Sequence, residues 1–478
     1  MVVAGDRSLL KRAFTGTAWV AVDRLLTLAV RFVVTLVLAW LLSPADFACV
    51  GILAVFVAVS TTLLDSGFGA ALIRESDPSQ TDYSSVFYWN LSVAVIMCLL
   101  LWLIAPAMGS WMSIPSLSSV MRGLSFGLIA DALCLIPANR LRKLLAFRTL
   151  AIVNLASLAV GGGAAVGAAY MHFGVWALVV LQVVTSFVKA ALLWVFARWL
   201  PSARFSAGAL RTLFSYGGFM FAASMLQEIC NNIQGVVIGR ISPLQVGFFN
   251  QAEKLNQITS YTLPNILVQV LFPVYSSMAS DLNRLASAVE SNVRLVAFAV
   301  IPLLTALFVV SEPLIHFLYG TKWLPAVPYF RIFCIAGCFV CLQNINFYAV
   351  ASAGFSRQLF WWSIYKWSVL LVLILFGSRW GAVGICWGMV ISSFNVWLVN
   401  ALLVSRYVGF RFSHQLRAVL PALGTAVFSF TLIIIIKWFC DSVSLWVLAV
   451  ILLAIYLLIA RLLQFRALDE VTSILSRL

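Results

Sequence analysis

Apolar segments of about twenty residues recur along the whole chain and are separated by short polar connections. A helix of this length crosses the ~30 Å hydrocarbon core of a bilayer, and it satisfies its own backbone hydrogen bonds in lipid. The pattern therefore predicts an all-α fold with about fourteen transmembrane helices. The predicted spans are 17–41, 47–65, 84–105, 118–138, 148–169, 174–197, 212–238, 245–271, 292–311, 327–350, 357–377, 380–404, 416–437 and 443–464.

Composition supports a polytopic membrane protein. Hydrophobic residues make up 63% of the chain and charged residues 10%, and the mean hydropathy is +1.03. A soluble fold of this length could not hide so much apolar surface. The first apolar segment is too long for a cleavable signal peptide and is expected to remain as a signal-anchor.

The basic residues predict the orientation in the membrane. The chain has 31 Lys and Arg residues against 16 Asp and Glu residues. With the N-terminus in the cytoplasm, most basic residues fall on the cytoplasmic side, as Lys and Arg do in membrane proteins generally. The opposite side carries only Arg122, Arg240, Lys322, Arg331, Arg379 and Lys437. Both termini are therefore expected in the cytoplasm, and attraction to an anionic leaflet explains the net charge without a nucleic-acid partner.

The sequence contains a weak internal repeat. "WLLSPADFACVGI" at 40–52 resembles "GRISPLQVGFFNQ" at 239–251, and each contains a Ser-Pro pair. Two six-helix lobes fit this repeat, 1–209 and 210–409, with two further helices and a cytoplasmic tail at 410–478. Lobes of even helix number share one topology, as in transporters whose halves are related by an axis along the membrane normal. Chance similarity between apolar helices is the alternative.

Two arginines inside the first predicted helix require an explanation. Arg24 and Arg31 are seven residues apart and share one helix face. A charge at the bilayer centre costs at least ~2.5 to 3.5 kcal/mol, so such residues usually face a cavity or a partner. Because the guanidinium group suits phosphate geometry and stays charged, the pair predicts an anionic ligand.

Polar side chains also line two helices at the start of the second lobe. One stripe comprises Asn250, Lys254, Gln257 and Tyr261 with Glu253 beside it, and the other comprises Gln227, Asn231 and Gln234 with Glu228 and Asn232 beside it. A water-filled cavity between the lobes would satisfy both stripes and the two arginines. Alternatively, the acids Asp23, Asp131, Glu228 and Glu253 neutralise nearby cations in ion pairs that lock helices together. The roles of Lys189 and Lys366 stay open.

No metal, cofactor or catalytic residue is expected. Cys334, Cys338 and Cys341 share one helix face but have no fourth ligand nearby, so we interpret them as small packing residues. No Walker P-loop is present, and the predicted outside loops are too small to carry the catalytic groups of a polymerase. The chain is therefore not expected to be an enzyme.

Several motifs, in their order and spacing, resemble one family. They are "LAWLLSPADFACVGI" at 38–52, "LLDSGFGAALIRE" at 63–75, "FFNQAEKLNQI" at 248–258, "LFPVYSSMASD" at 271–281 and "LYGTKWLPAVPYFRI" at 318–332. The chain resembles, over nearly its whole length, the bacterial polysaccharide flippases of the Wzx type. These belong to the multidrug/oligosaccharidyl-lipid/polysaccharide exporter superfamily.

The resemblance implies translocation of polyprenyl-diphosphate-linked oligosaccharide across the cytoplasmic membrane by alternating access, for exopolysaccharide or lipopolysaccharide assembly. It implies membrane lipid, a polysaccharide polymerase and export machinery as further partners. Such flippases are thought to have a cationic cavity, so Arg24, Arg31 and Lys254 become hypothetical contacts of the diphosphate. Glu228, Glu253 or Asp131 would be candidates for binding a coupling cation, and the last two helices for a lipid-tail groove.

Three other functions remain open. The first is a multidrug cation antiporter of the same superfamily, which should tolerate loss of Arg31. The second is a peptidoglycan-precursor flippase, which would share the architecture. The third, from a different class, is a membrane-embedded polysaccharide polymerase or ligase, which would depend on residues outside the membrane.

Overall fold

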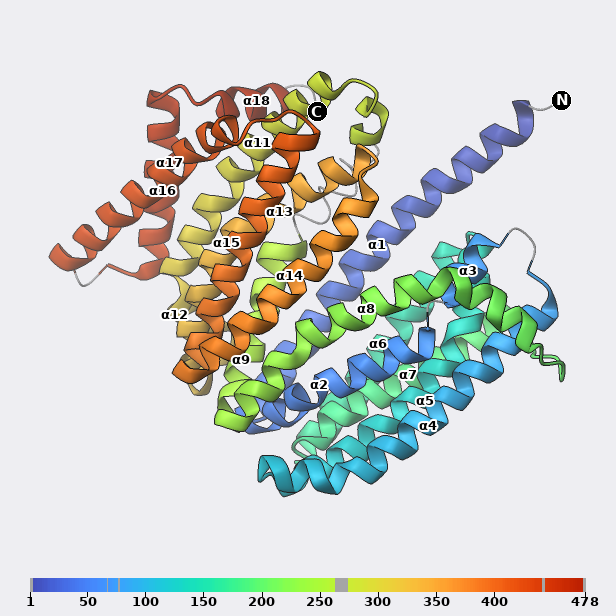
Figure 1. Cartoon of the computed structure of the whole chain (residues 1–478). Coiled ribbons are helices and arrows are strands. Elements are labelled where there is room, and N and C mark those ends of the chain that lie inside the picture. The colour runs from blue at the N-terminus through green and yellow to red at the C-terminus, as the bar shows by residue number, and fades with distance from the viewer. Residues whose placement is uncertain (1–2, 67, 76–77, 263–273, 441–442, 476–478) are drawn as a thin grey trace. The chain divides into compact units, whose positions relative to one another are not determined.

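The computed structural model describes residues 3–66, 68–75, 78–262, 274–440 and 443–475 (Figure 1). Side chains are described for these residues except 3–18, 21, 70, 73–74, 209, 212–220, 223, 261–262, 356–357, 360 and 471–475. The described part of the chain is nearly all helical and contains no strand, which confirms the all-α prediction. Helices let every backbone polar group find a partner within its own segment, as lipid requires.

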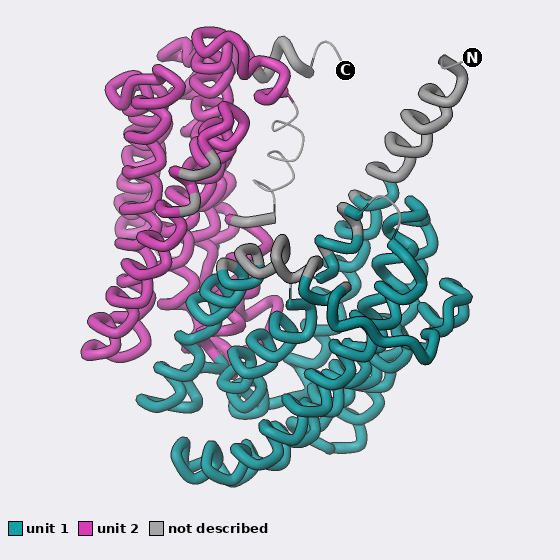
Figure 2. Tube along the Cα trace, turned by 45° about the vertical axis from the view of Figure 1, so that its right-hand side comes forward, with its two compact units in different colours: residues 1–247 teal, residues 248–478 magenta. Residues whose placement is uncertain are grey.

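The helices fall into two compact units, residues 1–247 and 248–478, which are described separately (Figure 2). In the first unit the helices are α1 Val3–Leu41, α2 Pro44–Asp65, α3 Phe68–Arg74, α4 Gln80–Met112, α5 Pro115–Lys143, α6 Phe147–Tyr170, α7 Trp176–Ala197 and α8 Ala207–Ile241. The helix α9 (Pro243–Asn256) begins at the end of this unit and leads into the second.

The second unit continues with short and long helical segments. They are η1 Gln257–Thr262, α11 Leu282–Val309, α12 Ser311–Tyr319, η2 Thr321–Ala326, α13 Val327–Ser352, α14 Ser356–Gly377, η3 Ser378–Trp380, α15 Gly381–Tyr407, α16 Phe412–Phe439, α17 Leu445–Leu462 and α18 Arg466–Leu475. The lobe limits predicted from the sequence repeat were 1–209, 210–409 and 410–478. The two compact units follow from contacts between residues and not from a repeat, so the predicted limits stay a prediction.

Eleven segments of the described chain are long and apolar enough to cross a membrane. One of them, Trp361–Tyr407, contains most of α14 and all of α15. The predicted spans 212–238 and 245–271 are not among the eleven, and both include residues whose side chains or backbone lie outside the description. A multi-pass membrane protein is thus confirmed, whereas the count of fourteen stays a prediction.

The Ser-Pro pairs of the sequence repeat each precede a helix. Ser43 caps α2, because its hydroxyl accepts from the Asp46 N–H at 3.3 Å while the Asp46 carboxylate accepts from the Ser43 N–H at 2.9 Å. Proline is well suited to the first helical position, where no N–H partner is needed. Pro243 likewise begins α9 directly after Ser242.

Within the first unit, packing runs from helix to helix. The helix α1 packs against α6, α6 against α7, and α7 against α5, which also contacts α4 and α2. The helix α8 packs against α2, α3 and α4. At the α2–α8 crossing, a Cβ atom built on Gly235 would lie 2.7 Å from the Gly51 carbonyl oxygen, so the backbones approach as closely as glycine permits.

In the second unit, α11, α13, α15 and α16 share one apolar core. The helices α16 and α17 pack against each other and against α11. The buried Tyr456 hydroxyl on α17 donates to the Phe298 carbonyl on α11 at 3.1 Å. This bond satisfies the one polar atom of an otherwise apolar side chain.

Candidate functional site

Asp23 on α1 forms a hydrogen bond with a neighbouring helix. Asp23 Oδ2 accepts from Asn154 Nδ2 on α6 at 3.0 Å, and Asp23 Oδ1 accepts from Thr27 Oγ1 at 3.2 Å. Both carboxylate oxygens therefore have neutral donors. Among the described residues Asp23 forms no ion pair with Arg24 or Arg31.

The two arginines of α1 lie on its exposed surface in the first unit. Within the described part of the chain, neither Arg24 nor Arg31 has a hydrogen bond or an ion pair. Arg31 is the tenth residue of the twenty-residue candidate span Val22–Leu41, and this position in the sequence corresponds to mid-depth in a membrane. An unpartnered cation at this depth needs water or an anion, because lipid provides neither.

The polar residues of α8 are divided between its surface and its packed side. Gln227 and Asn231 are exposed, as a cavity lining requires. Glu228 accepts from Asn232 Nδ2 at 3.2 Å, one helical turn away. Gln234 is buried and donates to the Asn231 carbonyl, while its own side-chain carbonyl has no partner among the described residues.

In the second unit, α9 presents Lys254 and η1 presents Gln257 at the surface, whereas Asn250 and Glu253 are half-buried. Glu253 lies close enough to Cys386 on α15 for an electrostatic interaction between the carboxylate and the thiol. The α-helical hydrogen bonding ends at Asn256 and continues as a π-helical turn. The predicted stripe assumed α-helical spacing throughout, and the side chain of its last member, Tyr261, lies outside the description.

Asp131 and Lys189 are neighbours rather than isolated charges. Asp131 on α5 accepts from the Ser186 hydroxyl on α7 at 2.7 Å, and Lys189, one turn further along α7, acts on it electrostatically. Lys366 on α14 lies over the ring of the adjacent Trp367, with its Nζ atom 4.2 Å from the centroid. Both lysines therefore have local contacts within their own units.

The three thiols of the cysteine cluster are directed at backbone and core. Cys338 Sγ donates to the Cys334 carbonyl at 3.6 Å, and Cys341 Sγ donates to the Ser260 carbonyl at 3.5 Å. Such weak bonds to the backbone are usual for packed cysteines. They agree with the packing interpretation.

Sequence reasoning missed a buried amide cluster on α13, α15 and α16. Gln415 Nε2 donates to Asn346 Oδ1 at 2.7 Å, and Asn400 Nδ2 donates to the backbone carbonyl of Gln343 at 3.1 Å. The side-chain oxygens of Gln343, Asn400 and Gln415 have no partner among the described residues. The spacing of Gln343 and Asn346, three residues apart in an apolar helix, was the signal that could have indicated it.

The candidate residues are thus distributed over both units. Arg24 and Arg31 share one face of α1 in the first unit, which also holds the residues of α8. Lys254, Asn250 and Gln257 belong to the second unit. A common cavity that joins them stays a prediction.

The family follows from a comparison with known proteins. Residues 37–328 match the model of a family described as polysaccharide biosynthesis protein. The chain belongs to this polysaccharide biosynthesis protein family. Its similarity to Wzx-type polysaccharide flippases, predicted from the motifs, is confirmed.

Two curated relatives align with most of the chain. The teichuronic acid biosynthesis protein TuaB of Bacillus subtilis is 25% identical and aligns over 74% of this chain and 74% of its own length. The lipopolysaccharide biosynthesis protein WzxC of Escherichia coli is 23% identical over 90% of this chain and 89% of its own. Both have names that refer to polysaccharide biosynthesis.

Two solved structures have the same fold. The lipid II flippase MurJ in an inward closed conformation matches with a TM-score of 0.72 and 12% identity, over 94% of this chain and 98% of its own. An inward-facing multidrug resistance MATE family transporter matches with a TM-score of 0.59 and 13% identity, over 84% and 99%. At this identity the likeness establishes a two-lobe transporter fold.

Proposed function

We propose that the chain is a flippase that moves a polyprenyl-diphosphate-linked oligosaccharide from the inner to the outer leaflet of the bacterial cytoplasmic membrane. The family, whose named relatives serve polysaccharide biosynthesis, supports the substrate class. The two-lobe transporter fold supports alternating access, in which two lobes rock about a central site. Transport rather than catalysis also agrees with the family.

The observation that carries this proposal is that Arg31 is exposed and has no partner within the described chain. Its side chain is exposed at mid-depth of a membrane span and has no ion pair or hydrogen bond within the described chain. A diphosphate would supply the missing charge and several acceptor oxygens, and the guanidinium fork can donate two parallel hydrogen bonds to it. Arg24, on the same face of α1, would hold the diphosphate near the membrane edge.

Residues of the second unit complete the proposed site. Lys254 would be the cationic contact from the other lobe, and Asn250 and Gln257 would bind sugar hydroxyls. On α8, the exposed Gln227 and Asn231 would do the same. The carboxylates Glu228, Glu253 and Asp131 are the candidates for ion coupling, and Asp23 is assigned to holding α1 against α6.

The substrate charge provides a driving force. A diphosphate diester carries roughly two negative charges, and moving one charge across 100 mV is worth about 2.3 kcal/mol. A potential that is negative inside therefore favours outward movement. Flipping then requires no nucleotide hydrolysis.

The likeness to the lipid II flippase fold makes a peptidoglycan-precursor flippase the second candidate. Mass spectrometry of polyprenyl-linked oligosaccharides from cells that lack the gene distinguishes the two, combined with digestion by an enzyme that reaches only the outer leaflet. Complete repeat units confined to the inner leaflet support the proposal. Accumulated peptidoglycan precursor favours the second candidate, complete units on the outer leaflet indicate a polymerase or ligase, and an unchanged lipid pool contradicts flipping.

A further inference from the structure

A pocket of about 460 Å³ lies at one end of the second unit, between α11, α16 and the turn that joins α17 to α18. Its lining includes Arg294, Arg417 and Arg466, with His414 and Glu290. Phe298 and Pro421 are among the apolar residues that also line it. The three guanidinium groups outnumber the carboxylates of Glu290 and of Glu470, which pairs with Arg294, so the pocket is attractive to anions.

Two of these arginines have no partner within the described chain. Arg417 and Arg466 are exposed, and among the residues that the structure describes neither forms a hydrogen bond or an ion pair. Clustered unpaired guanidinium groups repel one another, and a phosphate between them would relieve this repulsion. The pocket therefore has the charge and the donors of a phosphate site.

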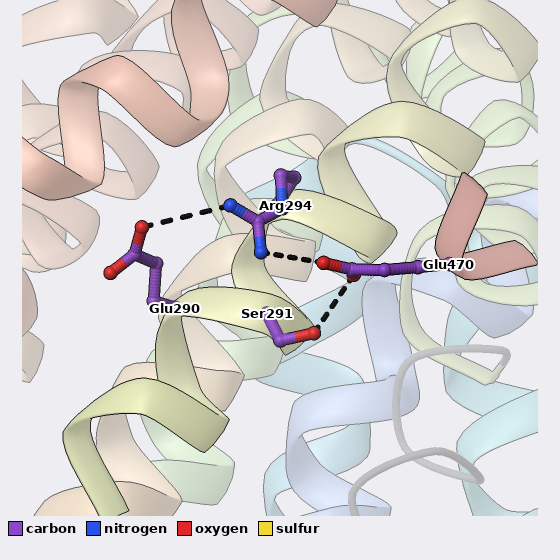
Figure 3. Close-up of polar contacts among 4 residues, drawn as sticks. All are labelled: Glu290, Ser291, Arg294 and Glu470. Carbon is purple, nitrogen blue, oxygen red and sulfur yellow. Dashed lines mark hydrogen bonds and ion pairs between the residues drawn. The ribbon is translucent and has the colours of Figure 1, made fainter. Parts of the chain in front are cut away.

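The third arginine is fixed in place. Arg294 Nη2 pairs with Glu470 Oε1 of α18 at 2.6 Å, and Nη1 approaches Glu290 Oε1 at 3.6 Å (Figure 3). The Ser291 hydroxyl donates to the second oxygen of Glu470 at 2.8 Å. The buried Nε of Arg294 has no hydrogen-bond partner in the described chain. One donor of this fixed side chain therefore remains unsatisfied.

The depth of the pocket favours a lipid over a dissolved ion. The helix α16 begins at Phe412 and α17 ends at Leu462, so the pocket lies at the ends of two candidate membrane spans. Lipid headgroups occupy this level of the bilayer. Leu463 lines the pocket and is 63% exposed, and Leu420, which precedes the lining residue Pro421 in the chain, is 55% exposed, so both offer apolar surface to acyl chains.

From these features we infer that the pocket binds the phosphate of an anionic phospholipid, with its acyl chains against the apolar surface of α16 and α17. Basic pockets between transmembrane helices on the cytoplasmic side bind such headgroups in other proteins. The bound lipid is a resident of the membrane, not the transported molecule. This inference does not rest on the proposed transport activity.

The test uses the purified full-length protein and two matched double variants. Arg417→Gln with Arg466→Gln removes two charges from the pocket. Arg411→Gln with Arg461→Gln removes two exposed charges from the same ends of α16 and α17, outside the pocket lining. Native mass spectrometry then measures binding of phosphatidylglycerol, phosphatidylcholine and inorganic phosphate.

We expect the wild type and the Arg411/Arg461 variant to bind one phosphatidylglycerol more strongly than phosphatidylcholine. A charge near the membrane surface contributes about fivefold to binding of anionic lipid, so the pocket variant should bind it roughly 30-fold more weakly. If the double variant does not fold, the same measurement is made on the two single variants, Arg417→Gln and Arg466→Gln. Each single substitution should weaken binding of phosphatidylglycerol about fivefold.

Four results would overturn the inference. Equal weakening in both double variants would show general surface attraction, and no weakening would place the lipid elsewhere. Inorganic phosphate that competes at the same concentration as phosphatidylglycerol would make this a free phosphate site. Displacement of phosphatidylglycerol by an equal amount of polyprenyl diphosphate would assign the pocket to the transported lipid.

Discussion

Asp23 on α1 and Asn154 on α6 form a hydrogen bond of 3.0 Å inside the first unit. The acid that the sequence places next to Arg24 is thus occupied by an amide from another helix, and its second oxygen binds Thr27. The consequence is a separation of roles on α1. Asp23 joins α1 to α6, and among the described residues it neutralises neither arginine.

Replacing Asn154 by Ala should lower stability without abolishing transport. A hydrogen bond between membrane helices is worth on average about 0.6 kcal/mol and up to about 1.7 kcal/mol. Because the acceptor here is a carboxylate that would lose its neutral donor, we expect the upper part of this range. Thermal unfolding of the purified protein measures it, and an unchanged melting temperature would show that the bond does not support α1.

Replacing Arg31 by Ala should abolish most transport while the protein still folds. A charge-assisted hydrogen bond contributes about 1.5 to 3 kcal/mol, so the loss should be about tenfold or more. Arg204→Ala is the matched control, because it removes one exposed arginine of the same unit from a loop outside the spans. Full polymer export by the Arg31 variant would rule out the assigned role.

Lys254→Ala tests the contact assigned to the second unit in the same way. If both cations bind the same diphosphate, the loss in the double variant with Arg31→Ala should be smaller than the product of the single losses. The rate of flipping in each single and double variant provides this comparison. Losses that multiply fully would indicate two independent roles.

Gly235→Ala should destabilise the first unit. The new Cβ would lie 2.7 Å from the Gly51 carbonyl oxygen, and forced separation of packed helices typically costs 1 to 3 kcal/mol. Gly163→Ala is the control, because a Cβ there meets no atom within 4 Å. Equal melting temperatures for the two variants would contradict the close approach of α2 and α8.

Glu470→Gln should loosen α18. It removes the 2.6 Å ion pair with Arg294, whereas Glu290→Gln removes only the 3.6 Å contact on the other side of the same guanidinium group (Figure 3). Hydrogen exchange at 466–470 should therefore accelerate more in the Glu470 variant than in the Glu290 variant. The opposite order would mean that α18 is held by its apolar contacts alone.

The regular features of the fold were predictable from the sequence, because they depend on local pattern. Apolar segment length predicted helices throughout, and the Ser-Pro pairs of the sequence repeat each lie at the start of a helix, α2 and α9. The depth of Arg31 in its span could also be read from sequence spacing alone. In these cases the local sequence decides the structure without help from distant residues.

Pairings between distant helices were not predictable. Asp23 lies 131 residues from Asn154, and Arg294 lies 176 residues from Glu470. Helical periodicity indicates which face is polar but not which helix will cover it. The change to a π-helical turn at Gln257 likewise has no signal in the apolar pattern, so the α-helical spacing assumed for that stripe does not hold over Gln257–Thr262.

The central claim is tested most directly by transport in proteoliposomes that contain a polyprenyl-diphosphate-linked oligosaccharide and a membrane potential. An external glycosidase reports the labelled lipid that reaches the outer leaflet. We predict rapid exposure with the wild-type protein, at least tenfold slower exposure with Arg31→Ala, and acceleration by a potential that is negative inside. Exposure by the wild-type protein no faster than in protein-free liposomes would contradict the account.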